Sequence, residues 1–478
     1  MKKAIFRVVA LLLSISFFVA CANPVEQVQE IVTVEHSYTS QLTKEELLYD
    51  FDYMMQLMED TFLFFGVAER RLGIDIRQLA QETRDIIENY PYSLQGFAEE
   101  LGIAFEDMPE LDEQIFVSIL RHEFFLPLGG FAHTGTLTFS GYNAFYPVFL
   151  NPGANQVTRL NSEAFTSPNA RRLYAEQAML FQTLAEENPA LLQFFFREEA
   201  YTLGTPLSIR PTLTMDIIEE DRIAYLEISS FLATSLDIYQ SRLMNFYRDI
   251  QEYEHLIIDI RNNYGGSHEF WRILVMYPLW RDRDYMPNMP LYSFYAGSEL
   301  GQILAEGNVR LESIMARHSL ETVNMLPISE ILASADLPYL NEDDLQHFSH
   351  GIRFNTSLDD IDRTMLTRFG LGHVPHIPFN GQIWLLVHEN NRSGPANFGL
   401  FAKYQNFATL VGEQAGGSYG LMAFFSLPNT GVIVCWDLNY MTDQYGRSLE
   451  EFPTAPHYFN LPGMDALETV LYMIGEAN

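Results

Sequence analysis

The pattern of apolar and polar residues predicts a helical N-terminal region. From residue 42 to about residue 128, apolar residues recur at three- and four-residue spacing, as they do on one face of a helix. Thr43 stands three residues before Glu46, which is the capping signature at the start of a first helix. Two further helices are predicted near Asp75–Ile87 and Asp112–Phe124.

The pattern then changes to strands and to an alternation of strands with helices. "HTGTLTFSGY", from His133, alternates as a strand does, whereas residues 150–210 are helical in pattern. From residue 213 the apolar strands "RIAYLEISSF", "HLIIDI", "QIWLLVHEN" and "ATLVGE" alternate with helical segments, which predicts an α/β fold with a largely buried sheet. Beyond Ala423, "AFFSLPNTGVIVCWDLNYMT" predicts a hairpin that turns at Asn429–Gly431.

The first residues have the pattern of an export signal. Basic residues precede the apolar run "VVALLLSISFFVA", which is too short to span a bilayer securely, and small residues lead to Cys21. This segment resembles the lipobox of bacterial lipoproteins, although Phe18 replaces the usual aliphatic residue. The resemblance implies lipidation of Cys21, a polar tether up to about Gln41, and attachment at the extracytoplasmic face of a bacterial membrane. The remaining cysteine, Cys435, is interpreted as a buried strand residue.

Composition narrows the classes of function. The 478 residues suffice for two or three folding units, and 47% of them are hydrophobic. The net charge of −33 repels phosphate backbones, which argues against nucleic acid as a partner. No metal site or cofactor is predicted, and the pair His268–Glu269 is interpreted as part of the surface or of a substrate rim.

One serine stands where a nucleophile could be activated. In "VHENNRSGPANFGL" a strand ends, a polar loop follows, and Ser393 and Gly394 open a helix. Pro395 suits the first helical turn. The partial positive charge of a helix N-terminus can stabilise an oxyanion, and a glycine there allows close approach of a substrate. The alternative is that Ser393 is an ordinary helix-capping serine.

A serine nucleophile needs a base and a group that orients the base. Lys403 lies ten residues into the same helix, about 15 Å along its axis, so it is a poor candidate. His133 in "GGFAHTGTL" is a better one, because a strand follows it; an ordinary loop histidine is the alternative. Glu450 and Glu451 in "GRSLEEFP" are candidate carboxylates, and exposed turn residues are the alternative for both.

These segments together resemble the C-terminal processing peptidases (tail-specific proteases), and within them the branch typified by the tricorn core protease. "LIIDIRNNYGG", Leu256–Gly266, is similar to the family's strand and glycine loop. "LLVHENNRSGPANFGLFAKYQNFATLVGEQAGGSYG" is similar to its nucleophile segment, and the interval back from Gly412 selects Ser393. "HTG" is similar to its histidine motif, and the glutamate of its closing segment falls on Glu450.

The resemblance implies a serine peptidase that hydrolyses peptide bonds of extracytoplasmic polypeptides. Ser393 would attack, His133 would take its proton, Glu450 would orient the imidazole directly or indirectly, and Gly394 with Gly265 or Gly266 would bind the oxyanion. It also implies a ClpP/crotonase-like catalytic domain. The implied division is a signal peptide, a tether, an N-terminal helical domain, a connecting segment and a catalytic domain (1–20, 21–41, 42–130, 131–212 and 213–478).

The departures from the family pattern leave an alternative open. Ser418 replaces the lysine of the family's Ser/Lys branch, no PDZ module is recognisable, and residues 285–376 form a possible insertion. A catalytically inactive lipoprotein of the same fold that binds a peptide or an apolar ligand is therefore the second hypothesis, since retinoid-binding proteins of the eye use this fold family for carriage. A purely structural lipoprotein is the third.

Overall fold

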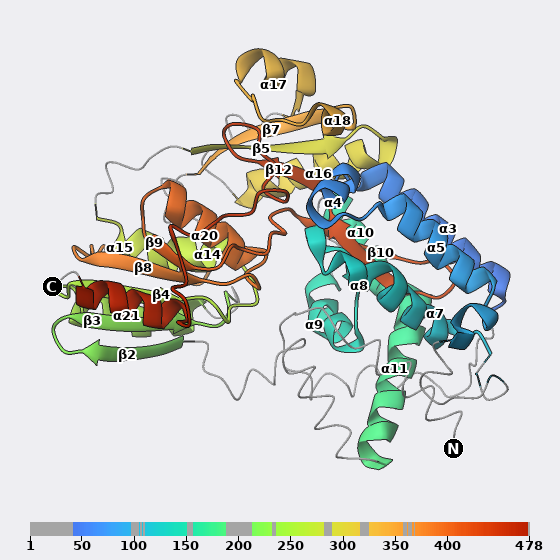
Figure 1. Cartoon of the computed structure of the whole chain (residues 1–478), viewed down its shortest axis with the longest axis horizontal. Coiled ribbons are helices and arrows are strands. Elements are labelled where there is room, and N and C mark those ends of the chain that lie inside the picture. The colour runs from blue at the N-terminus through green and yellow to red at the C-terminus, as the bar shows by residue number, and fades with distance from the viewer. Residues whose placement is uncertain are drawn as a thin grey trace. The chain divides into compact units, whose positions relative to one another are not determined.

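The computed structural model describes most of the chain after residue 41 and divides it into two compact units. The described residues are 42–96, 105, 108, 110–150, 156–187, 213–231, 236–281, 289–315, 325–356, 361, 366–367 and 369–476. The predicted signal peptide, Cys21 and the tether lie outside these ranges. Unit 1 comprises 1–209, 295–308 and 421–439, and unit 2 comprises 210–294, 309–420 and 440–478 (Figure 1). The change of unit near residue 210 lies close to the predicted border at 212/213.

The described part of unit 1 is mainly helical, as predicted. Its helices are α3 (Lys44–Thr61), α4 (Phe65–Leu72), α5 (Ile76–Glu88), η1 (Tyr92–Leu94), α7 (Glu113–Ile119), η3 (Leu120–Phe125), α8 (Leu126–Leu128), η4 (Phe131–His133), α9 (Phe139–Phe149), α10 (Gln156–Thr166) and α11 (Pro168–Glu187). Thr43 and Glu46 form the capping box that the sequence predicts for α3. Helices α5 and α7 confirm the other two predicted N-terminal helices.

A three-stranded sheet completes unit 1. Its order is β1 (Gly135–Thr136), β11 (Ile433–Asp437) and β10 (Met422–Ser426), and the β10–β11 pair confirms the predicted hairpin. Asp50 on α3 fixes the hairpin turn, since its carboxylate accepts the Asn429 and Thr430 N–H groups at 2.9 and 2.7 Å. The strand predicted from His133 is confirmed only at Gly135–Thr136, since His133 ends η4 and a helix begins at Phe139. The Thr138 side chain accepts the Gly141 N–H and caps α9, so local capping starts a helix there.

A six-stranded sheet is the framework of unit 2. Its strands are β2 (Leu213–Glu219), β3 (Ile223–Ile228), β4 (His255–Asp259), β8 (Gln382–Val387), β9 (Thr409–Gly412) and β13 (Tyr458–Phe459), in the order β13-β9-β8-β4-β3-β2. All neighbours are parallel except β2 and β3. Because the order follows the chain, successive right-handed crossovers place their helices on one face.

Side chains of alternate sheet positions pack against helices on opposite faces. Ile258 and Leu385 join the core with α13 (Leu236–Asp249), α14 (His268–Trp271), η6 (Arg272–Met276), α15 (Tyr277–Leu279) and α20 (Gly394–Tyr404). Ile257 and Leu386 instead join the core under α21 (Ala466–Glu476). The α/β class is confirmed by this arrangement, whereas the ClpP/crotonase-like detail stays a prediction.

The predicted insertion at 285–376 shares its sheet with a later segment. Its described elements are β5 (Met289–Ala296), α16 (Glu299–Met315), β6 (Leu326–Pro327), α17 (Ile328–Ser334), α18 (Glu342–Leu345) and β7 (Phe348–Thr356). The sheet order is β12-β5-β7-β6, and β12 (Asn439–Thr442) comes from after the nucleophile segment. Tyr440 on β12 donates to the buried Asp344 carboxylate at 2.7 Å, so these two segments fold together.

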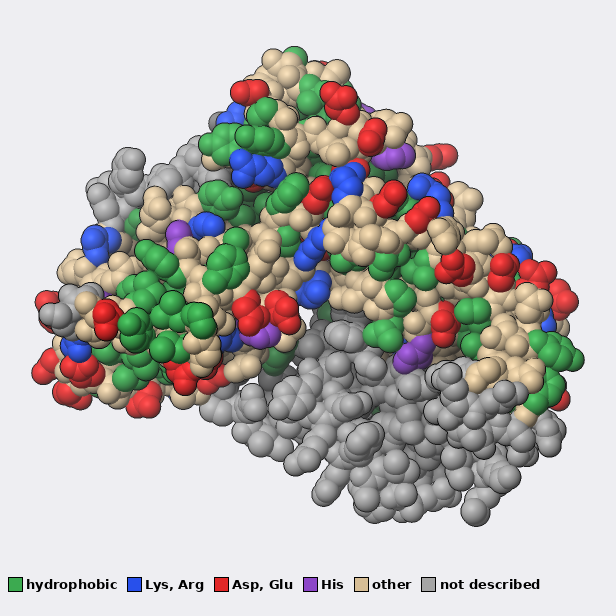
Figure 2. Space-filling view, viewed as in Figure 1, with side chains coloured by type: hydrophobic (Ala, Val, Ile, Leu, Met, Phe, Trp, Pro, Cys, Tyr) green, Lys and Arg blue, Asp and Glu red, His purple; other side chains and the backbone are tan. Residues whose placement is uncertain are grey.

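The surface matches the acidic composition. Asp and Glu side chains are spread over the face in Figure 2 rather than gathered in one patch, as a solubilising surface requires. Among the described helices, none is long and apolar enough to cross a membrane. The absence of a PDZ module stays a prediction.

Candidate active site

Two loops of unit 2 meet at the carboxyl edge of the parallel strands. Strands β4 and β8 are neighbours, with Asp259 opposite Leu386. The glycine loop, residues 261–266, follows β4, and the nucleophile loop, residues 388–393, follows β8. Loops that leave adjacent parallel strands at this edge lie side by side, where α/β proteins bind ligands. Asn391 confirms the proximity, because its Nδ2 donates to the Ile260 carbonyl at 2.7 Å.

Asn263 holds the glycine loop in its sharp turn. Its side chain donates to the Ile228 carbonyl at 3.0 Å and accepts the Gly265 N–H at 2.9 Å. Gly265 and Gly266 have φ values of 123° and 125°, which L side chains rarely adopt. A Cβ on Gly266 would lie 2.3 Å from the Phe231 carbonyl oxygen. The strand therefore ends in a turn that only glycine fits.

Ser393 occupies a strained position directly before α20. Its φ is 60° and its ψ is −121°, which is costly for a residue with a side chain. A sharp strand-to-helix turn of this kind exposes the nucleophilic serine in α/β-hydrolases. The hydroxyl makes no capping hydrogen bond to α20, and the residue is partly exposed. The geometry thus does not support an ordinary capping role.

The backbones of the two loops approach each other closely beside Ser393. A Cβ on Gly394 would lie 2.8 Å from the Gly266 oxygen and 3.3 Å from its nitrogen, so the two backbones are in close approach. Within the described ranges, neither the Gly266 nor the Gly394 N–H donates a hydrogen bond. The Gly265 N–H is engaged by Asn263. Of the two glycines predicted from this loop, Gly266 is therefore the available donor.

Glu450 lies behind the nucleophile loop. It is buried, with 2% of its surface exposed, and its Oε2 accepts the Ser418 N–H at 2.6 Å. The preceding residue, Gly417, accepts the Ser393 N–H at 3.2 Å. Ser418 itself has a φ of 59°. The predicted carboxylate is thus connected through backbone groups to the predicted nucleophile.

His133 lies in unit 1 and contacts an acid that sequence reasoning missed. Its Nδ1 is 2.6 Å from Asp437 Oδ1, and both side chains are buried. The residue has a φ of 54°, another strained backbone. The Cys435 thiol donates to the His133 carbonyl. Burial raises the pKa of this thiol, and its position on β11 agrees with the predicted buried strand residue.

Strand register explains why Asp437 meets His133. Gly135 pairs with Cys435 in the antiparallel β1–β11 ladder. Because the strands are antiparallel, the position two residues before Gly135 lies opposite the position two residues after Cys435. These positions are His133 and Asp437, whose side chains fall on the same face. An aspartate that ends the apolar strand "VIVCWD" was the available signal in the sequence.

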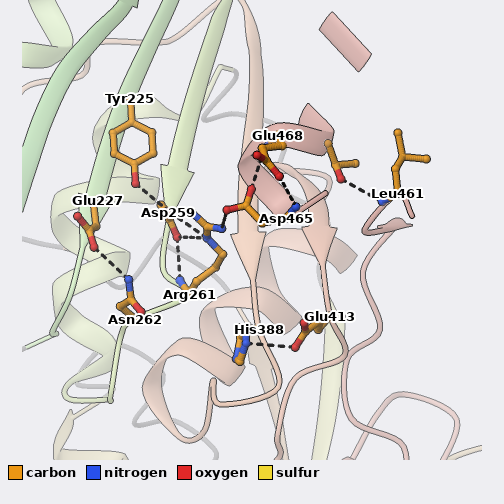
Figure 3. Close-up of polar contacts among 11 residues, drawn as sticks. Tyr225, Glu227, Asp259, Arg261, Asn262, His388, Glu413, Leu461, Asp465 and Glu468 are labelled. Atoms are coloured by element: carbon orange, nitrogen blue, oxygen red, sulfur yellow. Dashed lines mark hydrogen bonds and ion pairs between the residues drawn. The ribbon is translucent and has the colours of Figure 1, made fainter. Parts of the chain in front are cut away.

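Asp259 at the end of β4 and Arg261 in the glycine loop have a structural role. Asp259, 1% exposed, accepts from the Arg261 guanidinium and from the Tyr225 hydroxyl (Figure 3). Arg261 also donates to Asp465, in front of α21, at 2.9 Å. This network fastens the end of β4 to the helix on the opposite face, so the Asp and Arg of "DIRNN" support the loop.

The remaining candidates lie outside these contacts. His268 is exposed at the start of α14, as predicted, whereas Glu269 is buried and its N–H is capped by Ser267. Lys403 donates to the Ala455 carbonyl at 2.7 Å. Glu451 is partly buried and its N–H donates to Ser448. In the described part of the chain, no group of three His, Cys, Asp or Glu side chains is placed to hold a metal ion.

Comparison with known proteins gives a family for part of the chain. Residues 222–286, which include β3, β4 and the glycine loop, match the model of peptidase family S41. A search of curated protein sequences gives no match.

Several solved structures are similar to the chain at low sequence identity. A lipoprotein from Streptococcus agalactiae has 11% identity and a TM-score of 0.43, covering 93% of this chain and 100% of that one. Mature CPAF in complex with lactacystin has 14% identity and a TM-score of 0.45, with coverages of 91% and 97%. The photosystem II D1 C-terminal processing protease has 14% identity and a TM-score of 0.32, with coverages of 57% and 54%. The match to peptidase family S41 is thus a similarity over residues 222–286, and it agrees with the family resemblance predicted from the sequence.

Proposed function

We propose that the protein is a serine peptidase that cleaves extracytoplasmic polypeptides. The observation that carries this proposal is the strained backbone of Ser393, with φ 60° and ψ −121°, next to Gly266 and Gly394. Within the described residues, the N–H groups of these two glycines donate no hydrogen bond. Strain at a helix N-terminus next to free donors has no evident structural benefit, whereas it suits a nucleophile and its oxyanion pocket.

The chemistry follows from these residues. Ser393 Oγ attacks the peptide carbonyl carbon, and its proton passes to Nε2 of His133. The carbonyl oxygen, now negative, binds the N–H groups of Gly266 and Gly394. Collapse of this intermediate breaks the C–N bond, and His133 returns the proton to the leaving amine. Water then hydrolyses the acyl-enzyme by the same route. A carboxylate orients the imidazole, and the family resemblance implies Glu450 for this role, directly or indirectly.

A fluorophosphonate probe tests the nucleophile directly. The wild-type protein is expected to form a covalent adduct, and Ser393→Ala is expected to abolish it. Ser334→Ala is the matched control, because Ser334 is an exposed serine of α17 in the same unit. A folded wild-type protein that takes no label would contradict the proposal and favour the inactive ligand-binding alternative.

We also propose that lipid on Cys21 anchors the protein at the extracytoplasmic face. The support is the lipobox-like segment that ends in Cys21. Fractionation of cells that express the wild type or Cys21→Ser measures this. The wild type is expected in the membrane fraction and the variant in the soluble or secreted fraction. Equal distribution of the two proteins would remove the proposal without affecting the peptidase assignment.

A further inference from the structure

We propose that the two buried carboxylates have separate tasks: Asp437 orients the imidazole of His133, and Glu450 holds the backbone of Ser393. The inference rests on the proposed peptidase function and deepens it. It changes the role that the sequence assigns to Glu450, and it adds Asp437 as a positioning residue.

The contacts of the His133 ring nitrogens support the role proposed for Asp437. Nδ1 of His133 lies 2.6 Å from Asp437 Oδ1, at the length of a charge-assisted hydrogen bond. The proposed function uses Nε2 to take the proton of the nucleophile. Asp437 therefore occupies Nδ1, the nitrogen through which a carboxylate orients an imidazole whose Nε2 serves as the base. Asp437 is 0% exposed, so its carboxylate is held in a fixed place.

Backbone hydrogen bonds around Ser418 support the role proposed for Glu450. Glu450 Oε2 accepts the Ser418 N–H at 2.6 Å, and the adjoining Gly417 carbonyl accepts the Ser393 N–H at 3.2 Å. A carboxylate that binds one peptide group thus fixes the next carbonyl, which fixes the nucleophile. Both contacts lie within unit 2. They support a residue whose φ of 60° would relax without restraint.

Each compact unit therefore holds one catalytic group together with its own acid. Unit 1 contains His133 and Asp437, and unit 2 contains Ser393 and Glu450. Other titratable groups near the β1–β11 pair are the Cys435 thiol, Arg121, whose guanidinium binds Thr136 and the Leu137 carbonyl, and the Tyr174 hydroxyl, which accepts the Ile433 N–H. All three remain in every variant proposed below, so they do not confound the comparison.

The decisive experiment measures the pKa of His133 by histidine C2-proton exchange and mass spectrometry, which does not depend on activity. Asp437→Asn is expected to lower this pKa by about 1 pH unit or more, because an adjacent negative charge is lost. Asp437→Glu is expected to restore it in part. Glu450→Gln should leave it unchanged. Asp50→Asn is the matched control, since Asp50 binds the turn of the same hairpin away from His133.

Fluorophosphonate labelling against pH gives the second readout. Asp437→Asn is expected to slow labelling at neutral pH by about a thousandfold or more and to move its midpoint to lower pH. Glu450→Gln is expected to slow it about a hundredfold at an unchanged midpoint, because it displaces the nucleophile.

A shift of the His133 pKa by Glu450→Gln, with none by Asp437→Asn, would overturn the inference. If Asp437→Asn does not fold, the Glu450→Gln arm still decides, since any midpoint shift there contradicts the assignment. A wild type that takes no label would end the proposed function, while the pKa measurement would still test the pairing of His133 with Asp437.

Discussion

The proposed nucleophile and the proposed base are held in place in different ways. Ser393 stands in a loop fixed by Asn263, Asn391 and two glycines of adjoining loops, and its N–H is bound by Gly417, next to the Ser418 N–H that Glu450 accepts. His133 is held by Asp437, 304 positions away in the chain, through antiparallel register. Turns such as these require asparagines and glycines at particular positions, which can be recognised in a sequence. A contact that depends on which residues pair across two strands leaves almost no such pattern. This difference explains which half of the site is visible in a sequence.

The two halves also differ in what a substitution should disturb. The nucleophile half depends on close backbone approach, so added volume should damage it most. The base half depends on one charged contact, so loss of charge should change its pH dependence. The following predictions test the nucleophile half against this contrast.

The largest effect is expected from Gly394→Ala. Its Cβ would lie 2.8 Å from the Gly266 oxygen, which forces the two donors apart. Loss of one oxyanion donor reduces the rate by about a hundredfold to a thousandfold, so a drop of several hundredfold in peptide hydrolysis or labelling is expected.

Gly399→Ala is the matched control for this variant. It lies on the same helix, and its Cβ would only touch Leu410 and Val387 at 3.7 and 3.8 Å. Its rate should stay within about twofold of wild type, and its stability should rise by roughly 0.5–1 kcal/mol. Equal losses in the two variants would show that the helix as a whole, rather than the donor pair, governs activity.

Much of the fold and the two loops of unit 2 in the candidate site follow from the sequence, for identifiable reasons. The continuous apolar runs in "HLIIDI" and "QIWLLV" predict β4 and β8, because both faces of these strands pack on helices. Asn263 and the glycines mark the loop. Asp437 could not be found this way, because its partner depends on which strands pair. The strand predicted beyond Thr136 is wrong because Thr138 caps helix α9. This cap has more influence than the short alternation of apolar and polar residues.

An intermediate effect is expected from Asn391→Ala. The Asn391 side chain is fully buried, donates to the Ile260 carbonyl and accepts the His388 N–H at 2.8 Å. Its removal leaves two backbone groups without these partners, at a cost of about 1–3 kcal/mol each in free energy of unfolding. The loosened loop should also reduce the rate by about ten- to a hundredfold.

Denaturant unfolding and labelling of the same samples measure both consequences. Asn390→Ala is the control, because Asn390 is exposed in the same loop, and its stability should change by less than about 0.5 kcal/mol. The pH midpoint of labelling should be unchanged in both variants. A midpoint shift in Asn391→Ala would mean that the two halves of the site are not built independently.

The smallest effect is expected from Asp465→Asn, at the far end of the Arg261 network. The Asp465 side chain is 54% exposed, so its ion pair with Arg261 should contribute less than about 1 kcal/mol. Asparagine can still accept the Glu468 N–H that Asp465 accepts at 2.8 Å, so the variant removes the charge and keeps the cap. Asp465→Ala removes both and should cost about 1 kcal/mol more.

The pH dependence of this variant gives the sign of the charge effect. Burial raises the pKa of Asp465, but the Glu468 N–H and the Arg261 guanidinium outweigh it and lower the pKa below its ordinary value of 3.8. A carboxylate with a lowered folded pKa stabilises the protein above its unfolded pKa, and this contribution is lost as the pH falls through the folded pKa. The difference in Tm between wild type and Asp465→Asn should therefore be small but present at pH 7, and it should vanish towards acid pH. A difference that grows as the pH falls would mean that Arg261 does not hold Asp465 in its charged form, and that the glycine loop is fastened to α21 by the cap alone.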